Sequence, residues 1–131
     1  MYLDLILDAK QPYVALPDAI DVAEYEVGIC HLAVPKTFNN TITHISVQSG
    51  VIDQQYKGQR TLYTLTVHDA HRGPSLLVEP VHIQYRQFSV QHLKDISLTL
   101  LDQDGKLVEF DGGKILLVLH LRSKLTWKED F

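Results

Sequence analysis

The fold of this chain is decided by two apolar runs, Ile96-Ser97-Leu98-Thr99-Leu100-Leu101 and Ile115-Leu116-Leu117-Val118-Leu119-His120-Leu121. The turn Asp102-Gln103-Asp104-Gly105-Lys106 directly follows the first run. Aspartate and glycine suit a tight turn, because glycine has no Cβ to clash at positive φ and aspartate tolerates the left-handed region. We therefore predict that the two runs are β-strands joined as a hairpin, and that the protein is all-β.

Short segments of the same character fill the rest of the chain. They alternate apolar with polar side chains or are rich in β-branched residues, and they are bounded by proline, glycine or asparagine. The further strands that we expect are 2–8, 13–16, 24–34, 41–47, 51–56, 61–67, 76–78 and 81–85. Residues 17–21 could form one helical turn. Strands at this spacing favour a β-sandwich or a barrel.

Alternation along a strand also predicts which side chains share a face. In 24–34, side-chain alternation places Tyr25, Val27, Ile29 and His31 on one side, and Pro35 ends the strand because proline cannot donate to a sheet ladder. No strand carries an obvious catalytic residue.

Composition limits the classes of protein that this chain can belong to. With 131 residues and 45% hydrophobic content, it is long enough for one domain. A net charge of −4 disfavours direct binding of nucleic acid. The lone Cys30 excludes an internal disulfide and fits a reducing compartment. We expect no membrane span, because no run reaches the about 18–20 apolar residues that one requires.

The clusters that could carry chemistry match solvated loops better than active sites. His68 and His71 could hold a metal ion with Asp69 or Glu79, but their spacing favours a loop. No Gly-x-Ser-x-Gly motif is present, and Gly112-Gly113-Lys114 precedes a strand, so no helix dipole would face a phosphate. We therefore predict a protein that is not an enzyme, with no cofactor and no metal site.

The acidic residues around the turn are also better explained without a ligand. They lack the twelve-residue spacing of a calcium loop and its closing glutamate, so we interpret them as turn residues. They are Asp102, Asp104, Glu109 and Asp111.

Four segments, taken in order, resemble the minor capsid (penton) proteins of Polinton/Maverick-type elements and related double-jelly-roll viruses. They are Tyr25-Glu26-Val27-Gly28-Ile29, Pro35-Lys36-Thr37-Phe38-Asn39-Asn40, Asp102 to Phe110, and Leu119-His120-Leu121-Arg122. Each segment alone is strand or turn chemistry; the order and spacing from Tyr25 to Arg122 make the resemblance specific.

The resemblance implies a single jelly-roll β-sandwich of about eight antiparallel strands over residues 1–122, followed by a C-terminal tail, 123–131. It implies a structural virion protein, a penton subunit that forms a homopentamer at icosahedral vertices and docks to the major capsid protein. Exposed aromatic side chains are candidate anchors of such contacts. We therefore predict subunit-interface roles for Phe38, Trp127 and Phe131.

A second hypothesis is a small β-sandwich module that binds a glycan or a peptide through its loops. The loop from His68 to Ser75, with Tyr63 or Tyr85 nearby, would form its binding surface. A metal enzyme built on His68 and His71 is the hypothesis with the least support.

Overall fold

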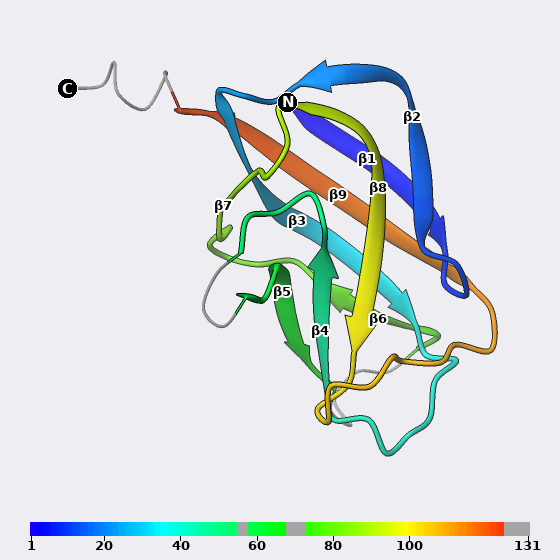
Figure 1. Ribbon diagram of the computed structural model, residues 1–131. Helices are drawn as coiled ribbons and strands as arrows, with labels where there is room; N and C mark the ends of the chain where they lie inside the picture. Colours follow the sequence, from blue (N-terminus) through cyan, green and yellow to red (C-terminus); the bar gives the residue numbers. More distant parts are fainter. Residues whose placement is uncertain (55–57, 68–72, 125–131) are drawn as a thin grey trace.

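The computed structural model describes residues 1–54, 58–67 and 73–124, and the elements within these ranges are all β-strands (Figure 1). This confirms the all-β prediction. The strands are β1 (Tyr2–Asp8), β2 (Tyr13–Asp21), β3 (Tyr25–Pro35), β4 (His44–Ser49), β5 (Thr61–Thr66), β6 (Ser75–Val78), β7 (Arg86–Gln87), β8 (His92–Leu101) and β9 (Lys114–Ser123).

The strands form two antiparallel sheets. Sheet A has the order β1-β9-β3-β6, and the short β7 also pairs with β3. Sheet B has the order β2-β8-β4-β5. Inward side chains of both sheets, such as Leu117 of β9 and Ile96 of β8, belong to one hydrophobic cluster between them. The described residues therefore share one core.

The strand pairs are nested in the sequence. β4 pairs with β5, β3 with β6, β2 with β8, and β1 with β9. The chain thus makes a long antiparallel ribbon in which β1 to β4 run against β5, β6, β8 and β9. Two further ladders, β3 with β9 and β4 with β8, join the ribbon to itself and complete the two sheets.

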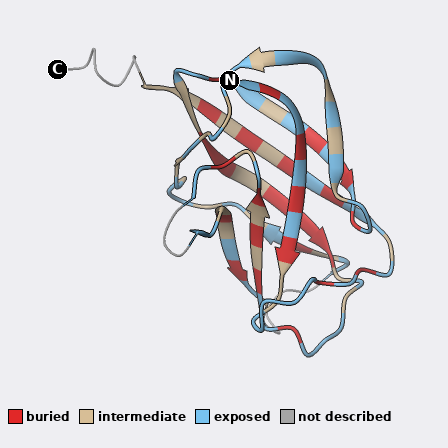
Figure 2. Cartoon of the chain, in the orientation of Figure 1, coloured by how far each residue is buried: buried red, intermediate tan, exposed pale blue. Residues whose placement is uncertain are grey.

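Strict alternation of side chains supplies the core. On β9, Ile115, Leu117, Leu119 and Leu121 are all buried and point inward, whereas Leu116 between them is half exposed on the outer side. The bands of buried and exposed residues along the strands in Figure 2 show the same period of two. The same period predicted strands such as 2–8, whereas 115–121 was predicted from its continuous apolar run.

The predicted hairpin at the end of the chain is wrong in one respect. Its turn is present, since Asp102 N donates to Lys106 O at 2.8 Å and Gly105 has a φ of 77°. β8 and β9, however, lie in different sheets. Each is a central strand that already has two partners, so after a bridge from Leu101 to Leu107 the chain crosses to the other sheet through residues 108–113.

Two local predictions are also corrected. Residues 17–21 are not helical, because β2 continues through Pro17 with a register shift between Ala15 and Ile20. Proline is tolerated there since β2 is an edge strand. On β3, a bulge between Ile29 and His31 turns His31 to the outer side, opposite Val118 and away from Ile29.

Two predicted strands are not formed as such. In 51–56, Ile52 makes an isolated bridge to Phe88, and residues 55–57 lie outside the described ranges. Residues 81–85 form no strand and instead connect β6 to β7.

Gly113 lies at the end of the segment 108–113, by which the chain passes from sheet B to sheet A, and its replacement tests the packing of that segment. Its φ is 99°, and an added Cβ would lie 2.7 Å from Cβ of Pro35. Gly113→Ala should therefore lower the free energy of unfolding by about 1–3 kcal/mol, because both the backbone and the packing are strained. Urea denaturation measures this loss. Gly50→Ala is the control, since nothing lies within 4 Å of its added Cβ; equal losses in the two variants would contradict this account.

Candidate functional site

An apolar row crosses the outer face of sheet A from edge to edge. The register places Ile6 opposite Leu116, Leu116 opposite Ala33, and Ala33 opposite Leu77. Ile6 is 65% exposed, Leu77 57% and Leu116 42%, although each has buried inward-facing neighbours on its own strand. We call these four residues the outer row.

Polar side chains flank the outer row on both sides. On one side, Lys114 Nζ lies 3.8 Å from Oδ2 of Asp8. On the other, His31 Nδ1 lies 3.1 Å from Oε1 of Glu79. An exposed apolar patch with a polar rim is typical of a surface that binds another protein.

The connection from β6 to β7 covers another part of the same face. It lies against Gly28 of β3, where an added Cβ would be 2.8 Å from the carbonyl oxygen of Gln84 and would also meet the side chain of Ile83. Glycine is therefore required at this position because of the close approach of another backbone. The connection brings Tyr85 to the outer face of sheet A.

Tyr85 joins a cluster of polar and aromatic groups there. Its hydroxyl oxygen lies 2.6 Å from Nδ1 of His120, and the guanidinium carbon of Arg122 lies 3.7 Å from the centre of its ring. Arg122 also forms an ion pair with Glu26 across the β3–β9 ladder, with Nε donating to Oε1 at 2.7 Å. The ring of Tyr2 lies 4.7 Å from that of His120, centre to centre.

Burial sets the protonation of this cluster. It lowers the pKa of His120, and the amino-terminal ammonium and Arg122 lower it further. Burial also raises the pKa of Tyr85, against the opposing effect of Arg122. The pKa of Cys30 is raised by burial as well, and its thiol donates to Val118 O at 3.4 Å. The cluster therefore holds a neutral imidazole and a neutral phenol near pH 7.

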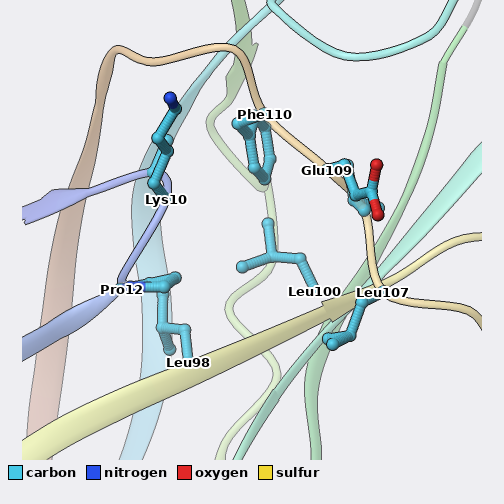
Figure 3. Close-up of a pocket in the computed structure, with 9 residues that line it drawn as sticks. Lys10, Pro12, Leu98, Leu100, Leu107, Glu109 and Phe110 are labelled. Atoms are coloured by element: carbon cyan, nitrogen blue, oxygen red, sulfur yellow. The ribbon is translucent and has the colours of Figure 1, made fainter.

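A cavity of about 490 Å³ opens beside the β1–β2 turn (Figure 3). Leu98 and Leu100 of β8 line it, together with Leu107 and Phe110 from the segment that leads to β9. Lys10 and Glu109 stand at separate places around its apolar lining, and Pro12, Ala9 and Val108 complete it. The cavity is thus apolar inside and carries one charge of each sign.

Of the three interface residues predicted from the sequence, the structure describes Phe38 alone. Phe38 is half-buried, and its ring packs edge-on against Phe110 with the ring centres 5.8 Å apart. Trp127 and Phe131 lie outside the described residues. The interface roles of all three stay predictions.

Of the other candidates from the sequence, the structure describes the acidic turn residues and not the two loop histidines. His68 and His71 lie outside the described residues, and the ranges that are described contain no group of three or more His, Cys, Asp or Glu side chains that could hold a metal ion. Asp102 acts within its turn, where its carboxylate accepts from the backbone N–H groups of Asp104 and Lys106. In the described part of the chain, no helix has the length and apolarity to cross a membrane.

Most of the loop proposed as a binding surface, residues 68–72, lies outside the described residues, so the loop site stays a prediction. Its two candidate tyrosines are separated: Tyr63 lies on β5 of sheet B, whereas Tyr85 packs on the outer face of sheet A. Sequence reasoning missed the outer row, although one signal for it was present. Ile6 and Leu116 are apolar residues at positions where alternation calls for polar ones.

Searches with this chain matched no protein-family model, no curated protein and no solved structure. Its surfaces must therefore be interpreted from their own chemistry.

The lowered pKa of His120 predicts a dependence of stability on pH. Between the folded pKa and the ordinary value of 6.5, the unfolded chain binds more protons than the folded protein. The contribution of neutral His120 is therefore complete above pH 6.5 and is lost as the pH falls through the folded pKa. Denaturation midpoints measured from pH 7.5 to about pH 5 should fall less in His120→Gln than in the parent. His92→Gln, at the exposed start of β8, is the control; a parental slope in His120→Gln would contradict the assignment.

Proposed function

We propose that this chain is a structural virion protein, a penton subunit with a jelly-roll fold. In this proposal it forms a homopentamer at the vertices of an icosahedral shell and docks to the major capsid protein. It performs no catalysis and needs no cofactor. Its site of action is the virion, after synthesis inside the host cell.

The nested strand pairing carries the proposal. Apart from the two-residue β7, eight strands form one antiparallel ribbon, and this ribbon is wrapped into sheets of the orders β1-β9-β3-β6 and β2-β8-β4-β5. A jelly roll is an eight-stranded double sheet of this kind, and capsid proteins use it as a building block. Lectin domains and cupins use the same fold, so the choice among these functions must be argued from the chemistry of the surface.

The segments that resemble penton proteins contact one another in pairs. Glu26 and Arg122, from the first and last segments, form an ion pair between neighbouring strands. Phe38 and Phe110, from the second and third segments, stack edge to face. The resemblance therefore rests on residues that meet in space, which supports a shared fold more strongly than four separate motifs would.

The strands β1 and β2, one edge strand of each sheet, carry features that oppose pairing with other strands. Residues 1–24, which include both of them, hold five acidic side chains and one basic side chain. Like charges and Pro17 on these edges oppose strand-to-strand pairing between copies. The outer row offers instead an apolar contact on the outer face of sheet A.

The second candidate is a small β-sandwich module that binds a peptide or a glycan. The cavity beside the β1–β2 turn favours a peptide, because its lining is mainly leucine and phenylalanine with one charge of each sign. Its volume of about 490 Å³ lies within the roughly 300–1,000 Å³ typical of ligand sites.

The native mass tests the proposed function. Light scattering on the purified chain should give five times the subunit mass of 14.9 kDa, and the rings should bind purified major capsid protein. A stable monomer that does not bind the major capsid protein would contradict a penton role. Peptide binding by such a monomer would support the second candidate.

A variant of the outer row tests which face takes part. Leu77→Asp should reduce the fraction of pentamer while leaving the melting temperature near the parental value, since Leu77 is 57% exposed. Thr99→Asp, at an exposed position of β8 on sheet B, is the matched control. Unchanged assembly in Leu77→Asp would remove the outer row from the ring contact.

A further inference from the structure

We propose that Trp127, in the C-terminal tail of one subunit, inserts into the apolar cavity beside the β1–β2 turn of the next subunit. This inference rests on the proposed function, because it supplies a contact for the ring. The occupant is a second copy of this chain, and the contact joins two different surfaces, as ring closure requires.

The lining of the cavity matches an aromatic anchor. Leu107 is 66% exposed, while Leu98, Leu100 and Phe110 are nearly buried, so an entering ring would meet apolar side chains at the floor and at the mouth. A large aromatic side chain buries about 150–250 Å² on such a contact. A leucine as exposed as Leu107 gains a partner by this docking.

Geometry excludes insertion of Trp127 into the cavity of its own subunit. The cavity adjoins the Lys114 end of β9, since Ala9 in its lining donates to Gly113 O at 3.0 Å. β9 is ten residues long and ends at Ser123, so its two ends are about 30 Å apart. Figure 1 shows the chain leaving β9 at the end away from the β1–β2 turn. Trp127 lies three residues beyond Lys124 and can reach at most about 11 Å from it.

The charges of the tail complement those at the cavity. Lys128, Glu129 and Asp130 follow Trp127 in the sequence. The cavity presents Lys10 and Glu109 at separate places, as Figure 3 shows, so the acidic pair and the lysine of the tail each have an opposite charge to face. Such rim charges set the orientation of an anchor more than its affinity.

Intrinsic fluorescence tests the insertion directly, because Trp127 is the only tryptophan of the chain. Emission and acrylamide quenching would be recorded over a dilution series of the full chain, and the mass of each sample would be measured by light scattering. In the assembled form, the emission should shift to the blue and quenching should fall several-fold relative to the dilute monomer. Trp127→Ala should weaken assembly about 30-fold, as loss of a buried aromatic anchor does.

Two cavity variants locate the contact. Leu107→Lys, at an exposed position, should leave folding intact by circular dichroism while Trp127 becomes fully accessible to acrylamide. Lys10→Glu should weaken assembly, and adding Asp130→Lys should restore it. Ser97→Lys, on the exposed side of β8, is the control and should behave as the parent.

The outcomes separate this inference from the proposed function. A pentamer in which Trp127 is quenched as in the monomer would overturn the insertion and leave the penton role standing. Shielding that survives Leu107→Lys, or shielding in the monomer, would also overturn it. A chain that stays monomeric at every concentration would contradict both proposals.

Discussion

Burial of one face of every long strand is the constraint on which this structure depends. A two-stranded ribbon has only one neighbour per strand, so its apolar face stays in water until the ribbon wraps. Wrapping brings Leu117 of β9 and Ile96 of β8 into one core, and each such side chain contributes about 1.5–3 kcal/mol. The β3–β9 and β4–β8 ladders satisfy the inner backbone groups as the sheets close.

The residues that remain on the surface after wrapping determine which contacts the molecule can make. The outer row remains on sheet A with polar neighbours, and the acidic residues of β1 and β2 oppose pairing at those two edges. The cavity lies where the chain turns at Lys10 and where Phe110 passes toward β9. The apolar row and the apolar cavity are therefore the two surfaces on which the proposed ring contacts rest.

The period of two in the sequence was sufficient to predict β1, while Pro35 marked the end of β3 and a continuous apolar run predicted β9. The period failed at His31, because a bulge depends on the register of a partner strand that is about ninety residues away in the chain. The pairing of Tyr85 with His120 and Arg122 was missed for the same reason, since neither partner is a neighbour of Tyr85 in sequence. Phe38 was recognised as an aromatic in a loop, but its contact with Phe110 needed the fold.

Electron cryomicroscopy of the purified assembly would show directly whether the subunits form the proposed ring. We expect closed rings with five-fold symmetry, in which each wrapped ribbon meets its two neighbours through different surfaces. Two-fold dimers, open filaments or isolated subunits in the images would contradict this proposal.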